Sequence, residues 1–387
     1  MNTPQILKKT LAHRNVTRLA WLATLLAFAV IVFGSFVRLS DAGLSCPDWP
    51  TCYGKAAWPT AKTAGELADH AANAIRTVDP TKAWREQLHR HLASVLGLLV
   101  FAIALLTAWR RPLGWQRIAG AAVITAAAIP LQMHGYYTAS TALVVLAELL
   151  LLYSAWRWDN SDLARASALA FAVIIFQAIL GMWTVTWLLK PIVVMGHLLG
   201  GLTTFGLLAW IAWRATDRPL HVAHLMRVRT YILIGLVLLG IQIALGGWTS
   251  SNYAALACGT DFPKCAGQWM PNTNFSDAFV LWRGVGVDYE GGVLDQASRA
   301  AIQISHRVMA VIAGLYLLFL GMRLWRTPGL RGRGAFLMLM VLVQISLGIG
   351  NVQMGLPLWM AVLHNAGAAI LLFMLVTLLA RVREPKL

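Results

Sequence analysis

Charged side chains are scarce in this sequence. Asp, Glu, Lys and Arg make up 12% of its 387 residues, whereas 58% of the residues are hydrophobic. A soluble fold of this length needs more charge to cover its surface, so the shortage excludes a soluble protein. We also expect no cleavable signal peptide, because the first apolar segment has full length and no small-residue cleavage site. We therefore predict an all-α, polytopic integral membrane protein.

Acidic residues are the rarer charged group, with 16 Asp and Glu against 32 Lys and Arg and a net charge of +16. In a soluble protein this surplus would suggest nucleic acid binding. If the N-terminus is cytoplasmic, however, 20 of the 32 Lys and Arg fall in cytoplasmic segments. That distribution obeys the positive-inside rule. We therefore expect no nucleic-acid partner, and a protein of the cell inner membrane with both termini in the cytoplasm.

About ten apolar windows are long enough to cross a bilayer, which takes about 20 residues. They fall at residues 18–38, 90–109, 117–134, 138–156, 165–187, 191–213, 230–250, 300–322, 335–353 and 359–380. Polar residues and Pro130 interrupt the third and fourth windows.

Cysteine is rare too, with four residues in the whole chain. In the predicted topology all four lie in outer loops, where an oxidising compartment favours disulfides. Their spacing makes Cys46–Cys52 and Cys258–Cys265 the economical pairing. The bridges could be structural staples or could have a redox role. Zinc binding is a further alternative, although the CxxC spacing that zinc usually requires is absent.

A short histidine motif at the head of an apolar segment occurs twice. The first copy spans 86–90 (EQLHR) and the second spans 303–307 (QISHR). In both copies a glycine follows the histidine by eight residues, at Gly97 and Gly314. Glycines near such helices allow a flat ring to approach the backbone closely. The motif therefore indicates an internal duplication with a cofactor site in each copy.

A second matched pair places a glutamine twenty residues before a histidine in each copy, Gln177 before His197 and Gln344 before His364. Each half therefore supplies two histidines on two helices, an arrangement that ligates one haem iron from both faces. Ionisable groups within a membrane are costly and usually functional. The predicted haem ligands are His89, His197, His306 and His364, all expected in the outer half of the bilayer.

The repeat offset locates an insertion in the first half. The offset is 212 residues from Gly34 to Gly246 and 217 from His89 to His306, but only 167 from His197 to His364. About fifty residues, roughly 112–160, were therefore added, and they match two spans joined by a short turn. Without them each half has four spans in the same orientation, which predicts two parallel-repeat four-helix bundles. We place the N-terminal half at 1–225 and the C-terminal half at 226–387.

Glu86 is the main difference between the two copies, because Gln303 stands at its counterpart. Glu86 lies three residues before His89 and therefore on the same helix face. It could be a helix-start carboxylate stabilised by the macrodipole. We favour a catalytic role, since loss of one acid after duplication suggests one reacting site and one site that passes electrons.

The remaining histidines and two arginines have simpler interpretations. Arg90 and Arg307 follow their histidines and could be snorkelling anchors or counter-charges for haem propionates. Six histidines do not recur in the repeat, and we expect them to be hydrogen-bonded or interfacial. They are His13, His70, His91, His134, His221 and His224.

Together these features resemble the haem A synthase family from about Gly34 to the last span, and residues 288–294 resemble its proteobacterial branch. The residues that carry the resemblance are Arg38, 43–50 (GLSCPDWP), Glu86, His89–Arg90, 177–185 (QAILGMWTV), His197–Leu198, 262–265 (FPKC), 288–294 (DYEGGVL), His306–Arg307 and His364–Asn365.

The resemblance implies an oxidoreductase that converts the C8 methyl of haem O into a formyl group, making haem A for cytochrome oxidase. By position, His306 and His364 would hold a permanent haem b. His89 and His197 would bind the substrate haem O, with Glu86 as the catalytic residue. Haem O synthase, cytochrome oxidase assembly factors and a second copy of the chain are expected partners. The family pattern has eight spans, from which this chain departs by its inserted pair.

Two other functions fit part of the pattern. A bis-histidine cytochrome b for electron transfer would carry two equivalent permanent haems, and it gives no reason for the Glu86 and Gln303 difference. A haem carrier would deliver cofactor to oxidase subunits without converting it. Analysis of the haems that the protein holds and produces discriminates between these alternatives.

Overall fold

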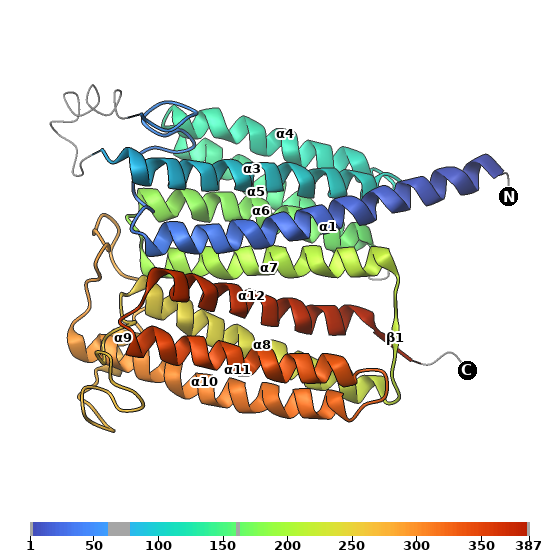
Figure 1. Cartoon of the computed structure of the whole chain (residues 1–387). Helices are drawn as coiled ribbons and strands as arrows, with labels where there is room; N and C mark the ends of the chain where they lie inside the picture. The colour runs from blue at the N-terminus through green and yellow to red at the C-terminus, as the bar shows by residue number, and fades with distance from the viewer. Residues whose placement is uncertain (1–2, 61–77, 160–162, 385–387) are drawn as a thin grey trace. The chain divides into compact units, whose positions relative to one another are not determined.

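The computed structural model describes residues 3–60, 78–159 and 163–384, and long α-helices dominate it (Figure 1). In chain order the elements of this part are α1 (Thr3–Leu39), α3 (Pro80–Ala108), α4 (Gly114–Met133), α5 (Tyr137–Arg157), α6 (Leu163–Thr186), α7 (Pro191–Thr216), β1 (Leu220–His221), α8 (Leu225–Ser251), α9 (Phe275–Ala278), α10 (Gln296–Trp325), α11 (Arg331–Gln353), α12 (Leu358–Arg381) and β2 (Val382–Arg383).

Within the described residues, nine helices are long and apolar enough to cross a membrane. The predicted all-α, polytopic class is therefore confirmed. The third predicted window forms helix α4, which is 20 residues long and contains Pro130. Helix α4 is not among the nine, so the predicted count of about ten spans exceeds this count by one.

The contacts between residues divide the chain into two compact units. Unit 1 comprises 1–30, 90–179 and 200–218, and unit 2 comprises 31–89, 180–199 and 219–387. The boundary falls within α1, α3, α6 and α7. The division into halves at residue 225 is not tested by this partition and stays a prediction.

In unit 1, helices α4 and α5 pack against each other as a hairpin. The facing positions carry small side chains, and Ala121, Ala128 and Ala147 are at most 2% exposed. Small residues let two helix backbones approach closely in a membrane. The hydroxyl of Ser140 donates to the carbonyl of Ala128 (2.9 Å), which links the two helices. The segment predicted as an insertion is thus a helix pair in the structure.

In unit 2, helices α8, α10, α11 and α12 form a four-helix bundle. Helix α10 packs against α8 and α11, and α12 packs against α11 and α8, so the four helices enclose a common core (Figure 1). Leu239, Leu317, Leu337 and Leu375 are at most 4% exposed within it. This is the architecture predicted for one repeat.

The two helices that carry the first histidine of each copy begin in the same way. Asp79 accepts from the backbone N–H of Thr81 (2.8 Å) at the start of α3, and Asp295 accepts from Ser298 N–H (2.7 Å) at the start of α10. Aspartate at this position satisfies backbone donors that a helix start leaves without partners. The hydrogen bonds to Thr81 and Ser298 lower the pKa of Asp79 and of Asp295.

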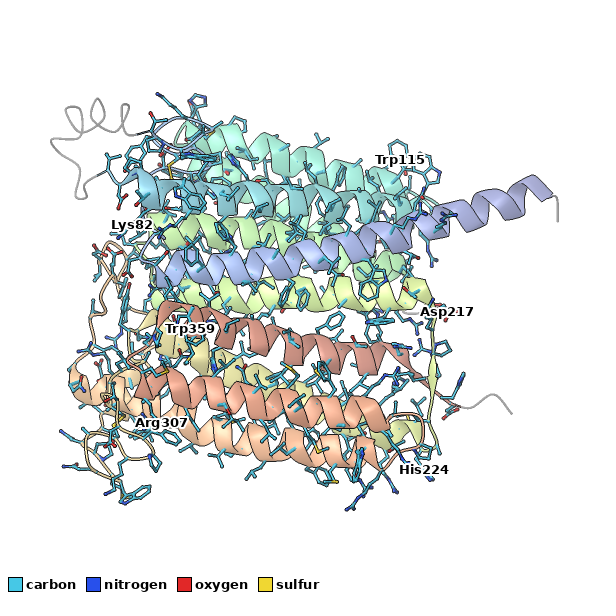
Figure 2. The ribbon with its side chains drawn as sticks, in the orientation of Figure 1. Lys82, Trp115, Asp217, His224, Arg307 and Trp359 are labelled. Atoms are coloured by element: carbon cyan, nitrogen blue, oxygen red, sulfur yellow. A yellow bond between two sulfur atoms is a disulfide. The ribbon has the colours of Figure 1, made fainter. Side chains whose placement is uncertain are left out.

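Strands β1 and β2 form a short parallel pair at the end of unit 2 that lies opposite the disulfide loops. Leu220 pairs with Val382 and His221 with Arg383, and the backbone N–H of Val222 donates to the carbonyl of Arg383 (3.0 Å). Figure 2 shows His224, which follows β1, at the end of unit 2 opposite Arg307. The strand pair therefore anchors the segment that leads into α8.

Candidate functional site

Each of the four predicted ligand histidines packs the Cε1 edge of its ring against a glycine on a neighbouring helix of unit 2. The distances from Cε1 to the position that a Cβ on the glycine would occupy are 2.7 Å for His89 with Gly34, 3.3 Å for His197 with Gly181, 3.1 Å for His306 with Gly246 and 3.1 Å for His364 with Gly348. Any larger residue would crowd the imidazole. The helix pairs are α1 with α3, α6 with α7, α8 with α10, and α11 with α12.

These glycines differ from the pair that the histidine motif first suggested. A Cβ added at Gly97 would meet nothing within 4 Å, and one added at Gly314 would meet the side chain of Ile345 at 3.3 Å. The close approach therefore occurs on the helix that faces each histidine. The repeated glycine pairs Gly34 with Gly246 (offset 212) and Gly181 with Gly348 (offset 167) are the sequence signal for it.

Glutamine amides contact both histidines of the second copy. Gln242 Nε2 lies 3.2 Å from His306 Nδ1, and Gln344 Nε2 lies 3.4 Å from His364 Nε2 while donating to the carbonyl of His364 (2.9 Å). In both contacts an amide NH2 group faces a ring nitrogen, so that nitrogen accepts and the ring proton lies on the other nitrogen. With the amide oxygen facing the ring instead, the imidazole N–H would donate to it and the second ring nitrogen would be free to bind a metal. Sequence reasoning identified Gln344 from the repeat but missed Gln242, because Val30 stands at its counterpart.

Each repeated glutamine packs its side-chain amide against a further glycine. A Cβ at Gly200 would overlap the amide of Gln177 in unit 1, and a Cβ at Gly367 would overlap the amide of Gln344 in unit 2. Both glycines lie three residues after a predicted ligand histidine, in the segments HLLG and HNAG. Sequence reasoning missed them, although this shared spacing was a usable signal.

Glu86 is buried (4% exposed) and binds the first disulfide loop. Its Oε2 atom accepts from the backbone N–H of Ser45 (2.7 Å) and of Cys46 (2.8 Å). Backbone donors of this kind stabilise an ionised carboxylate. Glu86 therefore does more than begin a helix, because it ties α3 to a loop about forty residues earlier in the chain.

Tyr53 adds a phenol to this region. Its ring packs against the Cys46–Cys52 disulfide and Ala83. Burial and, secondarily, the carboxylate of Glu86 raise the pKa of Tyr53, so the phenol stays protonated at neutral pH. The second copy has Ala266 at the equivalent place, and both residues have a positive φ. The sequence analysis did not identify Tyr53.

Both cysteine pairs are disulfide-bonded, Cys46 to Cys52 and Cys258 to Cys265, so their thiols cannot bind zinc. The two loops are themselves a repeat. In the first loop Asp48 accepts from Gly54 N–H (2.9 Å), and in the second Asp261 accepts from Gly267 N–H (2.6 Å). No group of three or more metal-ligating side chains occurs elsewhere in the described part of the chain.

Arg307 holds the second disulfide loop in place. Its guanidinium donates to the carbonyls of Lys264 (2.8 Å), Asp261 (3.0 Å) and Pro263 (3.3 Å). These bonds give Arg307 a structural role that neither sequence interpretation anticipated. A propionate role for Arg90 and Arg307 stays a prediction.

The turn between α6 and α7 contains a buried lysine. Lys190 is completely buried, and its Nζ atom lies 3.5 Å from the ring centroid of Trp282 and 5.1 Å from that of Trp187. Nζ has no hydrogen-bond partner among the described residues, and burial lowers the pKa of Lys190. The loop after α9 covers this turn, because the N–H of Tyr289 donates to the carbonyl of Leu188 (3.1 Å).

The structure describes the side chains of four of the remaining six histidines. His91, His134, His221 and His224 are exposed. His70 and the side chain of His13 lie outside the described part of the structure.

The fold and these contacts define the class: the chain is a polytopic helical membrane protein with a repeated pair of histidine-bearing helices, each histidine set against a glycine. Its sequence matches the family model COX15-CtaA, described as cytochrome oxidase assembly protein, over residues 17–135 and 123–376. The chain therefore belongs to this family.

Curated relatives extend the match over nearly the whole chain. A protein of Shewanella oneidensis named heme A synthase is 40% identical over 374 residues, covering 93% of this chain and 96% of its own length. Proteins of the same name from Caulobacter vibrioides and Rhizorhabdus wittichii are 26% and 25% identical, covering 96% and 91% of this chain and 97% and 89% of their own lengths.

Proposed function

We propose that this chain is a haem A synthase, an oxidoreductase that converts the C8 methyl of haem O into the formyl group of haem A. Membership of the family and the 40% identity to a relative of that name support this function. They do not favour the alternative of a pure electron-transfer cytochrome b. The observation that carries the proposal is the buried acid beside one histidine site, with an amide at its counterpart.

We assign a different haem to each site. His306 and His364 would hold a permanent haem b, and His89 and His197 would bind haem O as the substrate. The glycine contacts support both assignments, because the missing side chain gives each imidazole ring room against the facing helix and holds it there. The contact of Gln242 with His306 suits a permanent ligand, since it orients the imidazole.

Glu86 has the catalytic role in this proposal. Oxidation of a methyl group to a formyl group adds an oxygen atom from water or dioxygen and removes protons and electrons, so the site needs a proton acceptor, an oxygen donor and a route for electrons. Glu86 would accept a proton or stabilise positive charge that develops at the substrate, while the N–H groups of Ser45 and Cys46 keep its carboxylate in position. When bound, haem b would supply a path for the electrons.

The proposed orientation places both termini in the cytoplasm and the haem sites toward the periplasm. Two features support it, the basic segments on one side and the disulfide-bonded loops on the other. Haem O synthase is the partner that would supply the substrate, and cytochrome oxidase assembly factors would receive the product.

Expression with a haem O source, followed by extraction and chromatography of the haems, tests the proposed function. A synthase produces haem A. An electron-transfer cytochrome b holds only protohaem, and a haem carrier holds haem O without converting it. Either of these last two results contradicts the proposal.

The site assignment has its own test. His306→Ala should remove haem b from the purified protein, because it deletes one axial ligand of the permanent haem. His134→Ala, at an exposed histidine, is the matched control and should keep the haem b absorbance of the unmodified protein. Unchanged haem b in His306→Ala would refute the assignment.

A further inference from the structure

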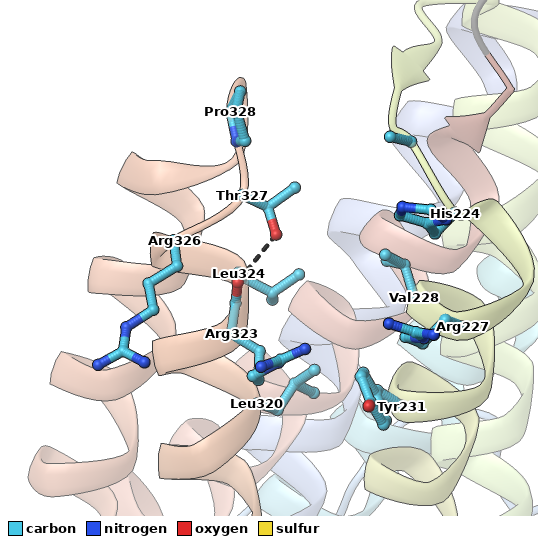
Figure 3. Close-up of a pocket in the computed structure, with 11 residues that line it drawn as sticks. His224, Arg227, Val228, Tyr231, Leu320, Arg323, Leu324, Arg326, Thr327 and Pro328 are labelled. Atoms are coloured by element: carbon cyan, nitrogen blue, oxygen red, sulfur yellow. Dashed lines mark hydrogen bonds between the residues drawn. The ribbon is translucent and has the colours of Figure 1, made fainter.

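A cavity of about 280 Å³ lies between α8 and α10 at the end of unit 2 opposite the disulfide loops (Figure 3). Arg227 enters it from the first turn of α8, and Arg323 enters it from the last turn of α10. Tyr231 and Leu320 lie beneath the two guanidinium groups in Figure 3, and Thr327 and Pro328 form the upper rim. Arg326 also lines the cavity but points away from Arg227 in this view.

The charge of this cavity is entirely positive. None of the eleven residues that line it is Asp or Glu. Two guanidinium groups that face each other repel, and an anion between them would remove that repulsion. Guanidinium groups bind phosphate oxygens through paired, charge-assisted hydrogen bonds. The cavity therefore suits a phosphate-bearing ligand.

The start of α8 adds further donors. His224 precedes the helix with a left-handed backbone and makes no side-chain capping hydrogen bond. The first N–H groups of a helix carry partial positive charge and point along the axis, which favours an anion in front of them. The strand pair of β1 and β2 holds the preceding segment, so this rim of the cavity is fixed in position.

The surface next to the cavity is aromatic and then aliphatic. Tyr231 contacts Phe319 with ring centroids 5.9 Å apart, and Phe319 contacts Tyr316 at 6.0 Å. Aromatic side chains of this kind gather where a membrane meets water. Further along the same helices, large apolar side chains are exposed, among them Val237 (61%) and Leu315 (64%). A ligand in the cavity would thus continue into hydrocarbon.

We infer that this cavity is a binding site for the headgroup of an anionic phospholipid. The phosphodiester would lie between Arg227 and Arg323, the glycerol would lie over Tyr231, and the acyl chains would follow the exposed apolar surface of α8 and α10. Basic pockets between membrane helices bind anionic headgroups in this way. A soluble phosphate would use the two arginines but not the aromatic and aliphatic surface.

Native mass spectrometry of the full-length, delipidated protein in detergent tests this inference. The probes are phosphatidylcholine, phosphatidylglycerol and cardiolipin, with inorganic phosphate as the headgroup anion alone. We expect phosphatidylglycerol and cardiolipin to bind about tenfold or more tightly than phosphatidylcholine, since each arginine near the surface contributes to anionic lipid attraction. Equal binding of all three lipids would overturn the inference.

The decisive variant is Arg227→Gln with Arg323→Gln, and its matched control is Arg331→Gln with Arg333→Gln. Both double variants remove the same charge, and Arg331 and Arg333 lie in the first turn of α11 outside the cavity. The first should reduce the preference for anionic lipid to about twofold or less, whereas the control should retain it. Equal losses would mean that surface charge alone attracts the lipid, which contradicts a specific site.

Displacement of bound phosphatidylglycerol by millimolar phosphate would show a site for the free anion and would also overturn the inference.

Discussion

Glu86 and Gln303 occupy corresponding positions in the two repeats, but their hydrogen bonds to the neighbouring disulfide loop differ. Glu86 accepts two N–H hydrogen bonds from the first loop. Gln303 is equally buried at 4%, and its Oε1 atom has no hydrogen-bond partner among the described residues. In the second repeat Arg307 holds the loop instead, by donating to carbonyl groups.

This comparison teaches that duplication preserved the scaffold and changed the polar chemistry. The histidine and glycine contacts, the aspartate at the start of α3 and α10, and the disulfide loops recur in both repeats. An acid and a phenol, Glu86 and Tyr53, occur only in the first repeat, where the second has Gln303 and Ala266. The glutamine that contacts the histidine of α10, Gln242, occurs only in the second.

We expect the largest loss of haem A formation when Glu86 is replaced by the glutamine that the second repeat has at this position. Glu86→Gln should lower haem A formation by about 100-fold or more, because the site loses the group that handles protons or positive charge. Both haems should remain visible in the absorbance spectrum, since the histidines are unchanged. The reciprocal Gln303→Glu is the control and should retain activity. Normal haem A production by Glu86→Gln would remove Glu86 from the mechanism.

We expect the second-largest loss of haem A formation when a glycine that contacts a histidine is replaced. Gly34→Ala places a Cβ 2.7 Å from the ring of His89, so the imidazole must move. We expect haem A formation to fall on the order of tenfold to a hundredfold, because small displacements at a reacting centre are costly. Gly240→Ala is the matched helical control, since a Cβ there meets nothing within 4 Å. Equal activity of the two variants would contradict a role for the close approach.

Loss of the glutamine contact should act on the second site alone. Gln242→Leu should reduce haem b affinity roughly tenfold, because groups that orient a metal-binding histidine typically contribute this much. Transfer of haem b to apomyoglobin, followed by absorbance, measures the affinity. Gln353→Leu, at an exposed glutamine, serves as the control. An unaltered transfer rate in Gln242→Leu would mean that the contact has no such role.

The smallest effect concerns Lys190, whose folded-state pKa lies below the value of 10.5 that a free lysine has. Between these two pKa values the unfolded chain binds more protons, so the free energy of unfolding should rise with pH. Lys190→Met should reduce the increase in the free energy of unfolding with pH. Thermal unfolding in detergent, from pH 7 upward, measures this pH dependence. Lys55→Met, at an exposed lysine, should keep it. An identical pH dependence in Lys190→Met and the unmodified protein would exclude this contribution.

Much of the helical architecture could be predicted from the chain, because membrane spans and their repeat are local patterns. Apolar windows predicted the helices, and matched spacings in the two copies identified four histidines. The glycines that the spacing placed near them, Gly97 and Gly314, are not the glycines that contact the rings. Whether α4 crosses the membrane could not be predicted from the sequence, since Gln132 and Pro130 leave its hydropathy near the limit for a spanning helix. Long-range polar contacts were also missed, because Ser45 and Cys46 lie about forty residues from Glu86 and no periodicity connects them.

The amino-acid sequence by itself determined the class of the protein, the order of its spans and the positions at which chemistry is duplicated, because each depends on composition and spacing along the chain. Only the tertiary structure decided which glycine faces which histidine, that Glu86 and Arg307 bind opposite polar groups of equivalent loops, and that Arg227 and Arg323 face one cavity. Those features depend on where distant segments fold back. Hydrogen bonds act over a few ångströms in space, whatever the separation in sequence.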